Sequence, residues 1–378
     1  MKRRHDDLDL PPTELALFTA FCDLQVAHRL QSQALDAVWR QLAQARHTRA
    51  RRPGSEGQIT LLYGPTGVGK TALWLACMER CRALHVQRGL TGLLPYLYTL
   101  CDVPTSGVWQ MKPFFENALT AADEVLIGQK QLIRPVTVAQ SSWQATTAGL
   151  RQATLNVLKN RQPPVFCIDE AHHLGIHSSD EQKDKNLDAI KTFADEAPVP
   201  ILMIGSYELI DFHSRSGRLG RRTVPFHLPR YDIEKEDDQF EYLSAVNFFA
   251  ERLPRGGVDL YAQGLDFMEQ TLGCVGLLKQ WLERAYFAAL WAGRREIRTV
   301  DLQEVAPSAE LVAQWLEEIN VGEARLRESR RPSSTADARV SKTTARTKTK
   351  KKSPTRKLFQ RTVGEDPVGA ARTTKVAA

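Results

Sequence analysis

The sequence predicts an α/β fold in which a parallel sheet is covered by helices on both faces. Three short apolar runs, Ile59–Tyr63, Pro164–Ile168 and Pro200–Ile204, alternate with helical patterns. Strands that are apolar throughout are typical of a parallel sheet buried on both sides. A glycine-rich segment, 64–71, joins the first run to a helical pattern. After Tyr231 the strand patterns stop and only helical patterns follow, so a small all-helical domain is expected there.

The remaining elements follow in chain order. Apolar residues at steps of three and four predict a helix over 13–48, and a second helix is expected over 71–88. A further strand is expected near 94–101, and a turn at Pro225. The helical domain is expected to contain four helices, at 233–253, 259–271, 275–292 and 300–319. We therefore divide the chain into an N-terminal helical extension (1–55), an α/β domain (56–231), a helical lid domain (232–321) and a disordered basic tail (322–378).

Charge is distributed unevenly along the 378 residues. From Ser329 to Ala378 there are 14 Lys and Arg against three Asp and Glu, a net charge of +11. The other 328 residues hold 37 basic and 41 acidic side chains, a net charge of −4. The net charge of +7 for the whole chain therefore comes from the tail, and the folded body is not basic. The tail is rich in Ser, Thr, Lys, Arg and Ala, a composition typical of disorder.

Several classes of protein are excluded by composition. No apolar run approaches the roughly 18 residues of a membrane span. Asp6, Asp7 and Asp9 stand where a signal peptide needs an apolar stretch. The six cysteines lack metal-ligand spacing and are expected to be buried thiols. We expect a soluble cytoplasmic protein without a membrane partner.

The segment Gly64-Pro65-Thr66-Gly67-Val68-Gly69-Lys70-Thr71 matches the Walker A pattern G-x-x-x-x-G-K-[ST]. Its glycines allow the backbone to curl so that N–H groups face phosphate oxygens. Lys70 supplies a positive charge to the β- and γ-phosphates, and Thr71 offers a hydroxyl to Mg²⁺. The segment follows a strand and opens a helix, whose N-terminus also favours anions. The sequence therefore predicts a P-loop that binds ATP and Mg²⁺.

A second acidic site follows about a hundred residues later. The apolar run 165–168 ends in Asp169 and Glu170. Asp169 is expected to hold magnesium, and Glu170 to act as the general base on the attacking water. His172 and His173 come next, and we interpret them as polar residues at a helix start rather than as metal ligands.

Three further polar features belong to the predicted site. Ser206 ends the strand 201–204 and is expected to lie beside the γ-phosphate. Lys279, about one turn into a lid helix, is expected to touch the nucleotide. The segment 214–222 contains four arginines, and it is either a solvated basic loop or the source of an arginine finger that acts on a neighbouring subunit. The candidate fingers are Arg218, Arg221 and Arg222, of which Arg221 is favoured because it precedes the expected Pro225 turn without abutting it.

These motifs together resemble those of one family. Their order and spacing resemble those of the AAA+ regulators of Tn7-like transposition, the TnsC/TniB group. The segments that carry the resemblance are the P-loop, Asp169–His173, Gly205–Leu209, the arginine segment running into Phe226–Tyr231, and Gly273–Trp281. The resemblance covers roughly residues 50–290. Ser206 stands where Thr or Asn is more usual in that group, and Lys279 stands where AAA+ proteins often have Arg.

The resemblance implies an ATPase that forms oligomers on double-stranded DNA, as a ring or a helical filament. It also implies that the assembly links a target-selection protein to the transposase. Residues that touch DNA are then expected on inserts of the ATPase domain, where Lys112, Lys130 and Arg134 are the candidate cations. The alternative for these three is a solvated loop.

Two other functions remain open at this stage. One is a different AAA+ machine, such as a replication-initiator or secretion-associated ATPase. The other is a scaffold that uses ATP as a structural ligand and barely hydrolyses it. In the tail, Lys348–Lys352 followed by Leu358 and Phe359 is interpreted as a partner-docking peptide that also adds salt-sensitive DNA affinity.

Overall fold

The structure is a computed structural model that describes residues 9–51, 56–103, 107, 109–130, 145–175, 178–214 and 222–329. Three predicted site residues, Arg134, Arg218 and Arg221, lie outside these ranges, as does the chain from 330 onward. Among the described residues the predicted parallel sheet and the helices that flank it are confirmed.

The sheet has five parallel strands in the order β2-β3-β4-β1-β5. Their bounds are β1 Ile59–Tyr63, β2 Leu97–Leu100, β3 Phe166–Asp169, β4 Ile201–Gly205 and β5 Thr223–His227. The central strand β1 pairs with β4 and β5, so that Tyr63 lies opposite Gly205 and His227. Because all strands are parallel, the segments that follow β1, β3 and β4 emerge at one edge of the sheet.

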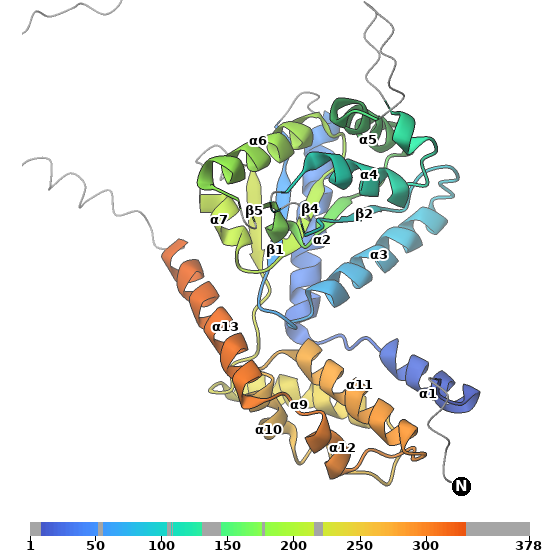
Figure 1. Ribbon diagram of the computed structural model, residues 1–378, viewed down its shortest axis with the longest axis vertical. Coiled ribbons are helices and arrows are strands. Elements are labelled where there is room, and N and C mark those ends of the chain that lie inside the picture. The colour runs from blue at the N-terminus through green and yellow to red at the C-terminus, as the bar shows by residue number, and fades with distance from the viewer. Residues whose placement is uncertain are drawn as a thin grey trace, which may run out of the picture. The chain divides into compact units, whose positions relative to one another are not determined.

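Helices cover both faces of the sheet (Figure 1). On one face, Leu62 packs in a buried cluster with side chains of α2 (Arg29–Arg51) and α3 (Lys70–Gln87). On the other, Leu61 belongs to a cluster built with four further helices. These are α4 Met111–Ala121, α5 Thr147–Arg161, α6 Asp180–Glu196 and α7 Leu209–Ser214. Neighbouring residues of β1 thus point to opposite faces, as the period of two in a strand requires.

The turn predicted at Pro225 is wrong, because Pro225 lies in the middle of β5 opposite Leu61. Strand β5 lies at one end of the sheet order and pairs with β1 alone among the described strands. Proline lacks the N–H that a second neighbour would need, and an edge strand tolerates it for that reason. Arg221 was favoured over Arg218 and Arg222 because of that turn, and without the turn the three arginines are equal candidates.

The helical lid consists of α9 Glu236–Ala250, α10 Gly264–Gln270, α11 Val275–Trp291 and α12 Thr299–Glu304. The predicted helix 13–48 is two helices, α1 (Pro12–Cys22) and α2, separated by residues 23–28. Helix α1 packs on the lid, where the ring of Phe21 lies 5.5 Å from that of Tyr286 and 6.1 Å from that of Phe249. The predicted extension 1–55 is therefore shared between the two domains.

The predicted helix 300–319 is also two elements, α12 and α13 (Ala309–Ser329). The predicted start of the tail at 322 falls inside α13. Gly322 packs flush against the ring of Tyr207, and Leu326 is buried in the core of the α/β domain. The last turns of α13 are thus part of the fold because they cover the end of β4.

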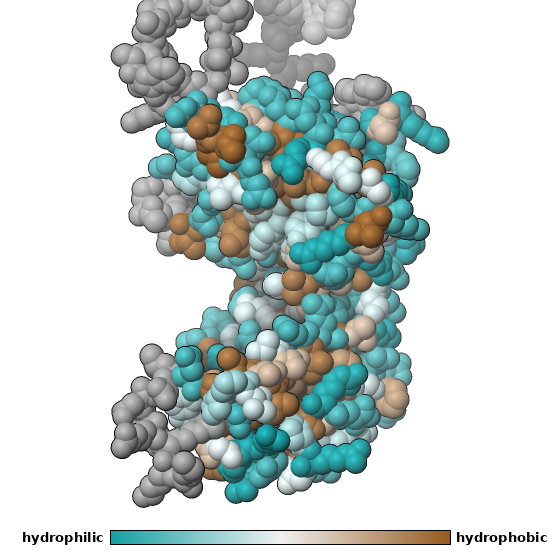
Figure 2. Space-filling view, turned by 90° about the vertical axis from the view of Figure 1, so that its right-hand side faces the viewer, coloured by the Kyte–Doolittle hydropathy of each residue, from teal (hydrophilic) through white to brown (hydrophobic). Residues whose placement is uncertain are grey.

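The cysteines and the surface agree with the exclusions drawn from composition. Five of the six cysteines are buried, Cys22 is partly buried, and all six are free thiols. Burial raises the pKa of Cys77 and Cys81 to about 12. The face drawn in Figure 2 shows apolar side chains in small separate groups over a hydrophilic surface. Among the described helices, none is long and apolar enough to cross a membrane.

Candidate functional site: a nucleotide cavity between the sheet and the lid

The P-loop joins β1 to α3. Gly67 has φ of 71° and Gly69 has φ of 106°, both in the left-handed region where a side chain would be strained. Val68 between them is buried in the core beneath the loop and anchors it. The loop therefore takes the curled conformation that the Walker A pattern predicts.

Lys70 is held at the centre of this loop. Its Nζ donates hydrogen bonds to the carbonyl oxygens of Gly64 at 2.9 Å and Pro65 at 2.8 Å. Burial lowers the pKa of Lys70, while the nearby carboxylates of Glu170 and Glu318 raise it. The lowering by burial is the larger effect, and an anionic ligand beside the ammonium group would raise the pKa again and stabilise its charge.

Asp169 ends β3 and is buried. Its Oδ1 accepts a hydrogen bond from the backbone N–H of Glu170 at 2.8 Å, and its Oδ2 accepts one from the hydroxyl of Tyr98 at 3.0 Å. Burial raises the pKa of Asp169, and these two hydrogen bonds lower it. Tyr98 was not predicted as a site residue. The sequence pattern that could have indicated its role is a tyrosine hydroxyl within the strand expected near 94–101.

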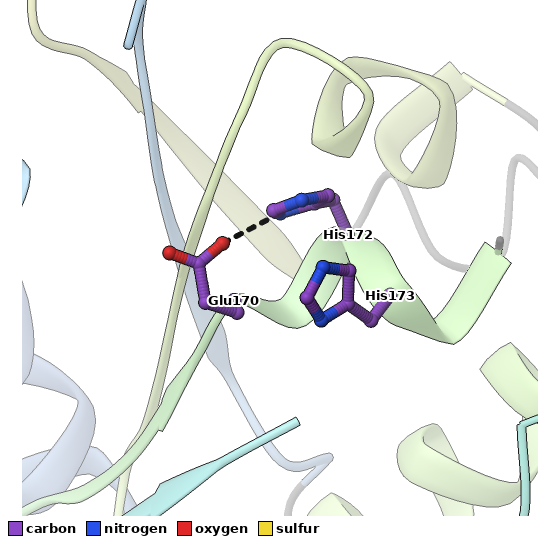
Figure 3. A group of neighbouring side chains, drawn as sticks. All are labelled: Glu170, His172 and His173. Carbon is purple, nitrogen blue, oxygen red and sulfur yellow. Dashed lines mark ion pairs between the residues drawn. The ribbon is translucent and has the colours of Figure 1, made fainter. Parts of the chain in front are cut away.

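Glu170 follows with φ of 52°, so the chain turns sharply at the strand end. Its carboxylate is half exposed, and its Oε2 lies 3.2 Å from Nδ1 of His172, as Figure 3 shows. The ring of His173 lies beside that of His172 with centroids 4.3 Å apart, and its Nδ1 donates to the carbonyl oxygen of Cys101 at 2.6 Å. The potential ligand atoms of these three side chains lie within 4.8 Å of one another. Each ring already has a hydrogen-bond partner, which supports the interpretation of the histidines as polar residues of a short helical turn, η2 (Ala171–Gly175).

Lys70, Glu170 and His172 border a cavity of about 1240 Å³. Thr71, Glu170 and Ser206 line it from the side of the sheet, together with P-loop residues from Thr66 to Lys70. Ser206 follows β4, which is the neighbour of both β1 and β3, so its place beside the P-loop follows from the strand order. The structure thus brings together the predicted P-loop, the acidic pair and Ser206.

The lid supplies the opposite wall. Lys279 of α11 lines the cavity. Its Nζ donates to the carbonyl oxygen of Cys22 at 2.6 Å and lies 3.4 Å from Glu283, and its predicted contact with a nucleotide stays a prediction. At the start of the same helix, a Cβ on Gly276 would lie 2.4 Å from the carbonyl oxygen of Gly67. The lid helix therefore rests directly on the P-loop.

Two parts of this helical wall were missed from the sequence. The first is the segment between α1 and α2, which lines the cavity from Cys22 to Val26 and at His28. His28 bonds through Nδ1 to the Tyr231 hydroxyl at 2.9 Å, and burial lowers its pKa to about 4. A signal was present, because Leu24 and Leu30 are six residues apart and break the spacing of the expected helix.

The second missed part is α13. The Thr66 hydroxyl donates to Glu318 at 3.0 Å, and Glu323 pairs with Arg230 at 3.1 Å. A carboxylate of the last described helix thus reaches the P-loop. No short motif marks such a contact between positions 252 residues apart.

Other predicted site residues lie elsewhere. Arg222 precedes β5 at the opposite end of the sheet, where it forms ion pairs with Asp195 and with Glu56, the latter at 2.8 Å. Lys112 on α4 lies 4.0 Å from Glu116, and Lys130 lies 3.1 Å from Glu124. None of the three borders the cavity. Arg134, Arg218 and Arg221 remain predictions outside the described ranges.

Comparisons with known proteins found a matching family model and similar folds. The family model of an AAA domain matches residues 50–212. The fold is similar to that of the ORC2 protein of Aeropyrum pernix in its ADP form, with a TM-score of 0.51 and 15% identity over 76% of this chain and 71% of that one. The same protein in ADPNP–ADP complexes gives a TM-score of 0.50 and 16% identity over 82% and 71%. A comparison with curated proteins found no match.

The matched range spans the P-loop, the acidic pair and Ser206, which are the parts of the site that lie on the sheet. The similarity to the ORC2 structures covers 76% and 82% of this chain, which is more than the range matched by the family model. Residues 50–212 therefore resemble an AAA domain, and the chain has an AAA+ fold with a helical lid.

Proposed function

We propose that this chain is an ATP-hydrolysing regulator of DNA transposition that assembles on double-stranded DNA and links a target-selection protein to a transposase. The observation that supports it most is the meeting of Lys70 and Glu170 at one cavity, with Asp169 next to Glu170 at the end of β3. Their motifs have the order and spacing that resemble the TnsC/TniB group.

The residues around the cavity fit ATP with magnesium. The P-loop glycines leave the backbone free to face phosphates, and Lys70 has only carbonyl oxygens as hydrogen-bond partners. Thr71 and Asp169 are the hydroxyl and the carboxylate that would hold Mg²⁺, which neutralises charge on the phosphates when bound. The volume of about 1240 Å³ is ample for a nucleotide.

Glu170 suits the role of general base because its carboxylate lies at the cavity and is half exposed, so it can accept a proton from water. Ser206 lies on the neighbouring strand end, where a hydroxyl can contact the γ-phosphate. Lys279 brings a cation from the lid, so closure of the lid on a triphosphate would bring its charge toward the phosphates.

The test of hydrolysis is Glu170→Gln. This variant keeps Asp169 and Lys70 but removes the base, so we expect ATP to bind with native affinity while turnover falls at least a hundredfold, the lower end of what a general base contributes. Assemblies on DNA should become longer-lived. Unchanged turnover would show that Glu170 is not the base.

The test of assembly is negative-stain microscopy with a non-hydrolysable ATP analogue, with and without duplex DNA. We expect rings or filaments that require both. An assembly that ignores DNA or nucleotide contradicts the proposal.

An arginine finger from Arg218, Arg221 or Arg222 is part of this proposal. If it acts on a neighbouring subunit, an arginine variant mixed with Lys70→Ala should recover part of the ATPase activity, because mixed interfaces pair an intact P-loop with an intact finger. Lack of recovery in assembled mixtures would assign the arginine a role within its own subunit or none.

A replication-initiator ATPase is the second candidate, and the fold similarity to ORC2 is what favours it. Both candidates require ATP and DNA. They differ in the partner, since only a transposition regulator should recruit a transposase to DNA in an ATP-dependent manner.

A further inference from the structure

The contacts of His172 go beyond those of an ordinary polar residue. Its side chain is 17% exposed and its Nδ1 faces two groups at once. One is Oε2 of Glu170 at 3.2 Å, and the other is the backbone N–H of Ser206, with a nitrogen to nitrogen distance of 3.5 Å. Figure 3 shows the carboxylate of Glu170 directed at the His172 ring.

The position of the His172 ring is fixed by neighbouring residues on both sides. A Cβ on Gly205 would lie 3.1 Å from Nδ1 of His172, so the missing side chain at the end of β4 makes room for the ring. On the other side it lies against the ring of His173, which is fixed by its bond to the Cys101 carbonyl. The position of Nδ1 between β3 and β4 is therefore set by backbone contacts.

The chemistry of a neutral imidazole limits what Nδ1 can do. With a proton it donates to Glu170, and without one it accepts from the N–H of Ser206, but it cannot do both. Burial and the adjacent His173 lower the pKa of His172, which favours the neutral ring.

We infer that His172 is a positioning residue that orients Glu170 through Nδ1–H in the nucleotide-free chain. The N–H of Ser206 faces the same Nδ1 and bonds to it only in the other tautomer, so the two groups compete for one nitrogen. A shift of Ser206 toward a γ-phosphate would change this competition and with it the orientation of Glu170. This inference rests on the proposed ATP hydrolysis, and it assigns to His172 no contact with ATP.

The experiment compares two isosteric variants of His172. The amide nitrogen of Asn occupies the place of Nδ1, whereas that of Gln occupies the place of Nε2. We expect His172→Gln and His172→Ala to lower kcat about tenfold to a hundredfold, a part of the 10²–10⁴ that a general base supplies. KM should stay within about twofold because no ATP contact is lost. His172→Asn should recover most of kcat, and His47→Ala, an exposed histidine on α2, serves as the control.

A second measurement reads the tautomer directly. In ¹⁵N NMR of the nucleotide-free chain, the signal assigned to His172 by its absence in His172→Gln should show a protonated Nδ1. An Nε2–H tautomer there, or equal kcat for the Asn and Gln variants, overturns the inference.

Different results would contradict the proposed ATP hydrolysis and the proposed role of His172. Full activity in His172→Ala together with inactive Glu170→Gln leaves the hydrolysis proposal standing and removes the role of His172. A wild-type chain without turnover removes both.

Discussion

The nucleotide cavity has two walls that differ in how they are built. The sheet wall carries its polar groups where parallel strands end, with the P-loop after β1, Glu170 after β3 and Ser206 after β4. The helical wall is made of the segment after α1, the start of α11 and the middle of α13. The register of the sheet fixes the first wall, whereas the second depends on how the lid packs. We therefore expect substitutions in the sheet wall to affect chemistry and those in the helical wall to affect how tightly nucleotide is held.

The largest effect is expected from Lys70→Ala, in the sheet wall. It removes the cation that the P-loop offers to the phosphates, and a charged hydrogen bond of that kind contributes up to about 3 kcal/mol, or roughly a hundredfold in affinity. Titration with a fluorescent ATP analogue measures it. Lys185→Ala, in an exposed i,i+4 pair on α6, is the matched control. Native affinity in Lys70→Ala would remove the basis of the nucleotide site.

The next effect is expected at the contact between the walls. In Gly276→Val the new side chain would collide with the Gly67 carbonyl and push α11 away from the P-loop. We expect ATP affinity to fall about tenfold, equivalent to roughly 1.4 kcal/mol, with an unchanged fold by circular dichroism. Gly128→Ala, where nothing lies within 4 Å of the added carbon, should bind ATP as the wild type does. Equal affinity in Gly276→Val would mean that the lid does not need to rest on the loop.

The difference between the sheet wall and the helical wall also explains which parts of the site could be predicted from the sequence. Gly67, Lys70 and Asp169 belong to short motifs, because phosphate and magnesium impose a fixed local spacing on the residues that bind them. Strands β1, β3 and β4 were predictable because they are almost entirely apolar, whereas β5 contains a proline that is typical of turns.

The helical wall has no such local pattern. Glu318 meets Thr66 and Gly322 meets Tyr207 only because α13 packs against the α/β domain at α7, and ordinary helix residues supply these contacts. Tyr98 likewise reaches Asp169 through strand pairing. Such long-range contacts require the folded structure.

A smaller effect is expected from Glu318→Gln. The carboxylate of Glu318 lies 3.0 Å from the Thr66 hydroxyl at the P-loop, where it repels a triphosphate. Glutamine keeps the hydrogen bond and removes the charge, so ATP should bind about twofold to fivefold more tightly, the size of an exposed charge interaction. The gain should shrink at high salt. Glu310→Gln, an exposed residue in the first turn of the same helix, is the control, and an equal gain there would indicate a general effect of net charge.

The smallest effect on the cavity is expected when the basic tail is removed, provided that the cut respects α13. A chain ending at Ser329 keeps Gly322, Glu323 and Leu326 in their contacts with the α/β domain. It loses all 14 Lys and Arg of the segment from 329 onward. We expect ATP-dependent assembly on DNA to persist at low salt, with a flatter dependence of DNA binding on salt, because fewer cations displace counterions. Recruitment of the transposase should also weaken.

A chain ending at residue 321 is the informative contrast. It exposes the surface that Leu326 covers, which costs about 2 kcal/mol of stability, and it removes the Glu323 partner of Arg230. Its melting temperature should fall, whereas that of the chain ending at Ser329 should match the wild type. DNA binding measured against salt, with and without ATP, then separates the roles of tail and helix. If the chain ending at Ser329 melts normally but no longer assembles on DNA at low salt with ATP, the tail is the DNA-binding element and the folded domains are not.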